Sequence, residues 1–132
     1  MPDMLVRLYT LPKWDELRSH LASQSVTIRR AIAPELHLVV KWVHDNFGDG
    51  WASETTVAFS NHPVSCYIAT QDGKILGFAC YDATCRNFFG PTGVAETERG
   101  RGIGKALLLA ALEAMAADGY GYAIIGAAGP TG

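Results

Sequence analysis

Long apolar runs, net charge and basic clusters are all scarce in this sequence of 132 residues. No uninterrupted apolar run approaches the ~20 residues of a membrane span, and the first residues lack the basic start and apolar core of a secretory signal. The net charge is -2, and the only close basic pairs are Arg29-Arg30 and Arg99/Arg101. This is too little for a polybasic surface. We therefore expect a cytoplasmic protein without a nucleic-acid or membrane partner.

Cysteine is also sparse, and its spacing is not that of a disulfide framework or a zinc site. Cys66, Cys80 and Cys85 are odd in number, form no Cys-x-x-Cys pair and lie in apolar or strand-like surroundings. None of the histidines has a spacing that links it to a cysteine as a catalytic pair. We therefore expect three buried thiols and no bound metal.

The length predicts one domain, since a chain of this size can bury a core of its own. Within the N-terminal segment, an alternating run at 5–10 predicts a strand, and the spacing at 14–22 predicts a helix. We interpret residues 1–25 as an extension that covers an edge of the sheet or mediates a homodimer. Residues 26–132 are then the domain itself.

Strand-like and helix-like patterns follow one another after residue 25. Asp72-Gly73 between two apolar runs predicts a hairpin, and Gly90-Pro91 predicts a bulge in the strand that it interrupts. The predicted strands are 26–31, 66–70, 74–84, 87–94 and 121–126, and the predicted helices are 34–48, 53–59 and 102–118, with a turn at 49–52. The first of these helices is expected to bury Leu36, Val39, Val40 and Val43.

A glycine-rich turn between a predicted strand and a predicted helix organises the chain. It lies between Val94 and Leu108, and its glycines at 100, 102 and 104 leave the backbone amides unshielded where the helix opens. Such a turn favours anions, and phosphate above all. A dinucleotide fingerprint is excluded because Lys105 stands where its third glycine is needed. A P-loop is excluded because Ala106 replaces the magnesium-binding hydroxyl.

The pattern Arg99-x-x-Gly102-x-Gly104 resembles motif A of the GNAT superfamily of acyl-coenzyme A N-acyltransferases. The resemblance runs from about Val26 to the end of the chain. It implies an α/β fold with a mixed, mostly antiparallel twisted sheet and helices on both faces. It also implies acetyl-coenzyme A as co-substrate, with the backbone of Val94 against the pantetheine arm. The diphosphate would lie on Arg99, Gly100, Arg101, Gly102, Ile103, Gly104 and Lys105.

The chain departs from the family pattern in two places. Ala95-Glu96-Thr97-Glu98 stands where a proline and an aromatic residue are often found. The family is also expected to continue beyond residue 132 with a helix and two strands, often with a tyrosine that protonates the leaving thiolate. Tyr120 and Tyr122 precede that position, so neither receives this role.

The implied reaction is attack of a primary amine on the thioester. Alkylamines are protonated at neutral pH, so the site needs a base. The candidates are Asp82, at the end of a central strand, and Glu96, with Glu54 as a third. The N–H of Val94 or its neighbour would hold the oxyanion. Contact with the acceptor is expected from Trp51, Glu54 and Tyr81.

The acceptor, a small-molecule or peptide amine, is not readable from the sequence. Two other functions stay open at this point. One is a coenzyme A-binding module without catalysis, and the other is an interaction domain whose glycine turn binds nothing.

Overall fold

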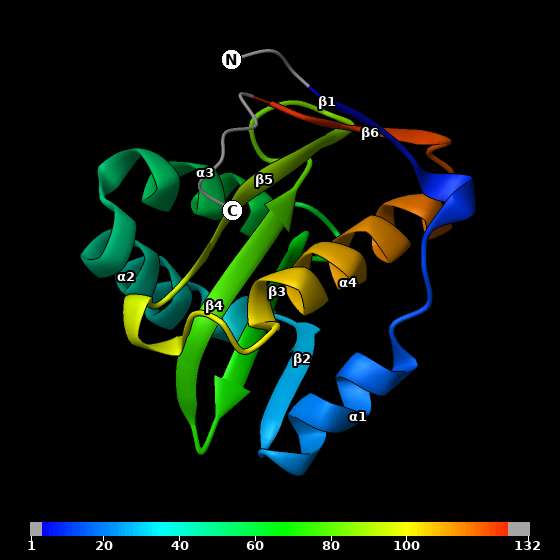
Figure 1. Cartoon of the computed structure of the whole chain (residues 1–132). Helices are drawn as coiled ribbons and strands as arrows, with labels where there is room; N and C mark the ends of the chain where they lie inside the picture. Colours follow the sequence, from blue (N-terminus) through cyan, green and yellow to red (C-terminus); the bar gives the residue numbers. More distant parts are fainter. Residues whose placement is uncertain (1–3, 127–132) are drawn as a thin grey trace.

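The computed structural model describes residues 4–126, which form a six-stranded sheet with four α-helices and three short 3-10 helices (Figure 1). The strands are β1 (Met4–Arg7), β2 (Val26–Arg30), β3 (Cys66–Gln71), β4 (Lys74–Tyr81), β5 (Phe88–Val94) and β6 (Tyr122–Ile125). The α-helices are α1 (Asp15–Ser23), α2 (Leu36–Phe47), α3 (Asp49–Phe59) and α4 (Ile103–Ala117). The 3-10 helices are Leu8–Thr10, Ala33–Glu35 and Glu96–Glu98. Within these residues no helix is both long and apolar enough to cross a membrane.

The sheet has the strand order β1-β6-β5-β4-β3-β2. Among the described strands, β5 and β6 are parallel, and every other pair of neighbours is antiparallel. Phe88 pairs with Ile124 and Phe89 with Ile125, and α4 connects the two strands. The predicted mixed, mostly antiparallel sheet, with parallel strands on either side of the long helix, is therefore confirmed.

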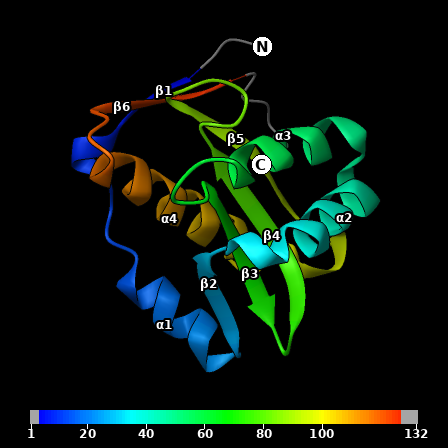
Figure 2. The same cartoon turned by 180° about the vertical axis from the view of Figure 1, so that it is seen from behind.

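Helices cover both faces of the sheet, as predicted. α1 and α4 lie on the face turned to the viewer in Figure 1, and α2 and α3 lie on the face seen in Figure 2. The first core contains most of α4 together with Leu21 of α1 and Val26 of β2. The second core lies between α2, α3 and the sheet, and includes Val39, Phe59 and Phe78. The sheet is thus buried on both sides, which explains the near-continuous apolar run of β4.

The N-terminal segment contributes both a strand and a helix to the domain. β1 pairs along β6, with Met4 opposite Ile125 and Arg7 opposite Tyr122. The strand is shorter than the predicted 5–10, because a 3-10 turn follows Arg7. Trp14, which precedes α1, donates from Nε1 to Glu113 Oε1 of α4 at 2.7 Å. The division of the chain at residue 25 and the homodimer stay predictions.

Two predictions about α2 and α3 are corrected. Val39 and Val43 are fully buried, but Leu36 is 38% exposed and Val40 only partly buried. The reason is that α3 packs beside α2, so these two side chains face the groove between the helices instead of the sheet. Residues 49–52, predicted as a turn, form the start of α3, since Gly48 (φ 99) alone makes the break.

β4 ends at Tyr81 and not at the predicted Thr84. The next residue, Asp82, adopts a left-handed conformation (φ 52) that takes the chain out of the strand. Cys85 therefore lies in an exposed loop, contrary to the predicted buried thiol. Cys66 and Cys80 are buried, as predicted.

β5 carries the predicted bulge. Ala79 of β4 pairs with Thr92, and Tyr81 pairs with Phe89, so one residue more lies on β5 than on β4 between these pairs. The extra residue falls at Gly90-Pro91, where proline cannot donate to the ladder. After the bulge, β5 leads into the glycine turn before α4 (Figure 1).

Candidate functional site

The glycine turn and the first turn of α4 form a backbone site for an anion. Gly100 (φ 83) and Gly102 (φ 86) are left-handed, a conformation that side chains disfavour. Gly102 is the N-cap of α4, no side chain caps the helix there, and its first turn contains no acidic residue. The first N–H groups of a helix have no intrahelical partner and carry the positive end of its dipole. The turn therefore presents uncapped donors.

Of the cationic side chains around the turn, two are exposed and one is paired with a carboxylate. Arg99 and Lys105 are exposed, and Arg99 Nε donates to the carbonyl of Val94 at 3.3 Å. Arg101 is instead paired with Glu98 Oε1 at 2.6 Å. Ile103 is only 1% exposed and belongs to the first core, so its side chain is not available to a ligand. The structure brings the predicted turn residues together, but the guanidinium of Arg101 already has a carboxylate partner.

Val94 directs its backbone groups away from β4. Gly77 is paired with Val94, and Ala95 N donates to Leu76 O at 2.8 Å. In an antiparallel ladder this pattern marks Gly77 and Val94 as a pair without mutual hydrogen bonds, so the N–H of Val94 points to the other side of β5. The described pairing with β6 involves only the start of β5. The part of β5 next to the turn thus offers the N–H of Val94 to an extended ligand.

An aromatic cluster lies beside β5 on the face covered by α2 and α3. Phe47 packs on Trp51 with ring centroids 5.0 Å apart, and on Phe78 of β4 at 5.8 Å. A Cβ added to Gly93 of β5 would lie 2.4 Å from Cζ of Phe47. Trp51, a predicted acceptor contact, is 37% exposed and lies one ring away from β5. Sequence analysis missed Phe47, although a glycine inside a strand is a signal of close approach.

The other two predicted acceptor contacts already have protein partners. The carboxylate of Glu54 accepts a hydrogen bond from the hydroxyl of Thr84. Tyr81 is 1% exposed, and its hydroxyl accepts from Nη1 of Arg30 at 2.7 Å. Burial raises the pKa of the Tyr81 phenol. Tyr81 is a core residue, and contact with an acceptor does not fit its burial.

The two predicted catalytic carboxylates lie at opposite ends of β5. The N–H of Asp82 donates to the carbonyl of Phe88, the first residue of β5, at 3.0 Å. Glu96 follows the last residue, Val94, and is exposed next to the glycine turn. Since a strand rises ~3.3 Å per residue, the length of β5 separates the two carboxylates by about 20 Å. They cannot act on the same atom.

Asp82 belongs to a polar cluster that includes a tyrosine. Its Oδ1 accepts from the backbone N–H of Asn87 at 2.7 Å and from the hydroxyl of Tyr120 at 3.2 Å. Interaction with Tyr120 also raises the pKa of Arg86. Oδ1 of Asn87 is buried without a partner among residues 4–126. Sequence analysis gave Tyr120 no role, but the fold joins it to Asp82 because α4 ends beside the loop between β4 and β5.

The buried thiols lie in the core, and the described part of the chain contains no cluster of metal ligands. Cys66 and Cys80 face each other across β3 and β4. Interaction with the neighbouring Cys80 thiol, together with burial, raises the pKa of the Cys66 thiol, and a protonated thiol is a poor nucleophile. Residues 4–126 contain no group of three or more His, Cys, Asp or Glu side chains placed to hold a metal ion.

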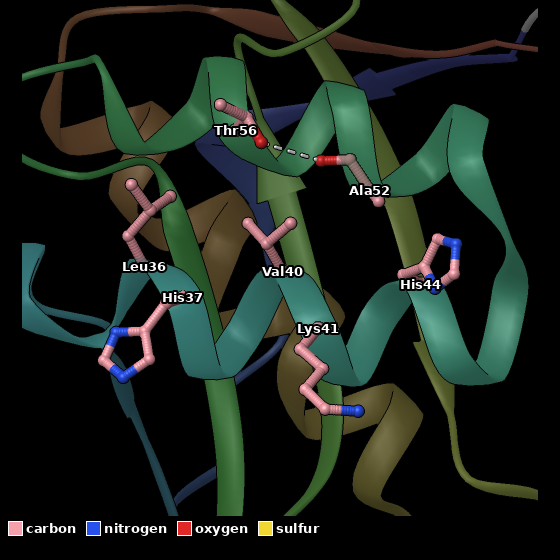
Figure 3. A pocket seen from close by; sticks show the side chains of 7 residues that line it. All are labelled: Leu36, His37, Val40, Lys41, His44, Ala52 and Thr56. Carbon is pink, nitrogen blue, oxygen red and sulfur yellow. Dashed lines mark hydrogen bonds between the residues drawn. The ribbon is translucent and has the colours of Figure 1, made fainter.

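A groove with a volume of about 440 Å³ lies between α2 and α3 (Figure 3). His44 at its rim is 2.7 Å from Asp49, and Thr56 donates to the carbonyl of Ala52 at 3.0 Å. The residues that line it are Leu36, His37, Val40, Lys41, His44, Ala52 and Thr56. All of them belong to α2 or α3, and none is a residue of the glycine turn or another predicted site residue.

The sequence from α2 to beyond β6 matches a known family. Residues 36–129 match the acetyltransferase (GNAT) family. The chain belongs to this family. The resemblance drawn from the glycine turn is thereby confirmed, and the chain contains a GNAT acetyltransferase domain. No curated protein gives a significant match to the sequence.

Solved structures agree in the fold. A GCN5-related N-acetyltransferase from Sphaerobacter thermophilus is 20% identical, with a TM-score of 0.75 over 97% of this chain. A GCN5-related glucosamine N-acetyltransferase region in a fungal multi-domain GH3 β-N-acetylglucosaminidase is 16% identical, with a TM-score of 0.75 over 94%. A putative acetyltransferase from Pyrococcus horikoshii is 24% identical, with a TM-score of 0.56 over 71%. This chain spans 44%, 17% and 36% of those chains, respectively, and at these identities the likeness concerns the fold alone.

Proposed function

We propose that this chain binds acetyl-coenzyme A and transfers its acetyl group to a primary amine. The observation that carries the proposal is the uncapped start of α4, preceded by two left-handed glycines and flanked by exposed Arg99 and Lys105. Membership of the GNAT family supports the same ligand. A diphosphate on these amides would accept hydrogen bonds at the positive end of the helix dipole.

The pantetheine arm would lie along β5. The N–H of Val94 faces away from β4, and by the alternation of the ladder so does that of Thr92. These groups suit the amides of an extended arm in the way that a sheet edge binds a peptide. We infer that the arm runs from the turn toward the bulge at Gly90-Pro91, where β5 departs from regular pairing.

This direction favours Asp82 over Glu96 as the base. Glu96 lies at the diphosphate end of the path, whereas Asp82 lies at the other end, toward which the arm carries the thioester. Tyr120, hydrogen-bonded to Asp82, would connect the carboxylate to the reacting groups or to a water molecule. The amine would lose its proton to this cluster, attack the thioester carbonyl and release the thiolate.

The acceptor would approach from the face of the aromatic cluster. Trp51 is exposed there and rests on Phe47, which touches β5 at Gly93. An exposed indole suits the alkyl or cationic part of an amine. The proposal covers small-molecule and peptide amines alike, and it includes a cytoplasmic location and a homodimer.

Thermal unfolding with acetyl-coenzyme A, coenzyme A and ATP at equal concentration tests the ligand. A ligand at about 100 times its dissociation constant adds about 2.7 kcal/mol, which raises the midpoint by several degrees. We expect both coenzyme A species to stabilise the protein and ATP to have little effect. Absence of any shift with coenzyme A would refute the proposed ligand.

Thiol release from acetyl-coenzyme A in a panel of primary amines tests the reaction. Asp82→Asn should lower the amine-dependent rate at least ~100-fold, the usual contribution of a positioned base. Glu96→Gln, which removes the other candidate carboxylate, serves as the matched control and should leave the rate within about twofold. Binding of coenzyme A without thiol release for any amine would identify a non-catalytic binding module instead.

A further inference from the structure

The N-terminal helix α1 touches the glycine turn directly. A Cβ added to Gly102 would lie 2.9 Å from Cδ1 of Leu17. Leu17 is partly buried against the first core, which also contains Ile103 of α4. The side of the turn that faces α1 is therefore closed by protein, and an anion has to approach from the opposite side.

A hydrogen-bond network ties the turn to the junction between α1 and β2. Nη2 of Arg101 donates to Oε1 of Gln24 at 3.0 Å, and its Nη1 donates to Glu98 at 2.6 Å and to Oε1 of Gln71 at 3.5 Å. Nε2 of Gln71 in turn donates to the backbone carbonyl of Gln24 at 2.7 Å. Three segments that are distant in sequence, the end of α1, the end of β3 and the turn, thus meet at one guanidinium.

Gln24 has a fixed position within this network. It is the C-cap of α1, and its backbone N–H donates to the carbonyls of Leu21 and Ala22. Ser25, the next residue, is a non-glycine residue in the left-handed region (φ 65), and its N–H also donates to Ala22 at 2.9 Å. Such a conformation is rare for serine and persists only where the surroundings determine it. The backbone of Gln24 is therefore held at a place from which its side-chain Oε1 reaches Arg101.

We propose that Gln24 is a positioning residue for the anion-binding turn, acting through Arg101. This inference rests on the proposed binding of coenzyme A. Both ends of the Arg101 fork are occupied by Glu98 and Gln24, so this side chain braces the turn against α1 and does not bind the diphosphate. Arg99 and Lys105 are left as the exposed cations of the site. Gln24 lies outside residues 36–129, the part of the chain that matches the family, whereas Arg101 lies within it.

A double-mutant cycle tests the brace. The dissociation constant of coenzyme A is measured by calorimetry for the wild type, Gln24→Ala, Arg101→Gln and the double variant. Gln24→Ala should weaken binding about three- to tenfold, the effect of one ordinary hydrogen bond at an exposed position. The same substitution should add nothing when residue 101 is already glutamine, because the two residues act as one unit.

Several results would overturn the proposal. One is unchanged affinity in Gln24→Ala, and another is an equal effect of this substitution with arginine or glutamine at residue 101, as expected if Arg101 contacts the diphosphate itself. Ser19→Ala, at an exposed position of α1, is the control and should bind like the wild type. The midpoint of unfolding without ligand should stay within about 2 °C in Gln24→Ala, since the side chain is exposed. A large fall with unchanged affinity would assign Gln24 to stability only. Failure of the wild type to bind coenzyme A would instead refute the proposed function.

Discussion

Gly102 and Gly104 are separated by one residue, yet alanine should have opposite effects at the two positions. Gly102 is left-handed (φ 86), and an added Cβ would meet Cδ1 of Leu17 at 2.9 Å. Gly104 lies within α4, and the nearest atom to an added Cβ is Cγ2 of Val94 at 3.6 Å, an ordinary contact. The backbone conformation, and not the available space alone, therefore decides the sign of the effect.

The left-handed conformation costs an alanine about 1–2 kcal/mol. The end of Leu17 can move slightly, so the contact adds little to this cost. Gly102→Ala should therefore lower the free energy of unfolding by about 1–2 kcal/mol and the midpoint by about 4–8 °C. Gly104→Ala should raise the free energy of unfolding by about 0.5 kcal/mol, because alanine is the better helix former and restricts the unfolded chain.

Urea unfolding of the two variants and the wild type, analysed with a common slope, measures these differences. Coenzyme A affinity is measured on the same samples, and Gly102→Ala should bind more weakly because the strained turn no longer holds its amides in place. If Gly102→Ala is as stable as the wild type, the left-handed turn described above is incorrect. If Gly104→Ala is the less stable variant, the same argument fails for the start of α4.

Three further predictions concern the stability of the fold. Tyr81→Phe should lower the free energy of unfolding by about 1–2 kcal/mol, because Arg30 loses a buried acceptor; urea unfolding measures this, and an unchanged value would contradict it. Gly93→Ala should destabilise by about 1–3 kcal/mol through overlap with the ring of Phe47, and Phe47→Leu in the same chain should restore part of the loss; strictly additive effects would exclude the contact. Glu35 accepts a hydrogen bond from Arg29 of β2, which lowers the pKa of the Glu35 carboxyl group. The ion pair therefore stabilises the fold fully above the unfolded pKa of ~4.3. This stabilisation is lost as the pH falls through the lower pKa of the folded state. The difference in midpoint between the wild type and Glu35→Gln should therefore be larger at pH 7 than at pH 3, and a constant difference would refute the linkage.

Local signals in the sequence were sufficient for the elements of the fold and for the glycine turn. Glycine and proline mark places where elements end or turn. The chain ends a helix at Gly48, turns at Asp72-Gly73 and bulges at Gly90-Pro91, each as predicted. The spacing of Arg99, Gly102 and Gly104 predicted both the family and the start of α4, because a backbone anion site depends on consecutive residues. The parallel pairing of β5 with β6 followed from the helix between them.

Predictions that depend on packing between distant segments were less accurate. Periodicity placed Leu36 in the core, but it cannot tell which apolar side chains of a helix face the sheet and which face a neighbouring helix. The sequence also could not show that Tyr81 is buried against Arg30, since the two residues lie on different strands. Asp82 and Glu96 were both reasonable bases by residue type, and only the fold shows that they lie at opposite ends of β5.

Sequence alone was enough for local features, namely the type and order of the main strands and helices and the glycine turn that exposes its amides. The tertiary structure decided which residues meet. It brought Tyr120 to Asp82, Phe47 to Gly93, and Gln24 to Arg101. Backbone conformation responds to neighbours in the chain, which a sequence displays directly. Contacts across the sheet depend on the order and register of strands, which are fixed only when the whole core packs.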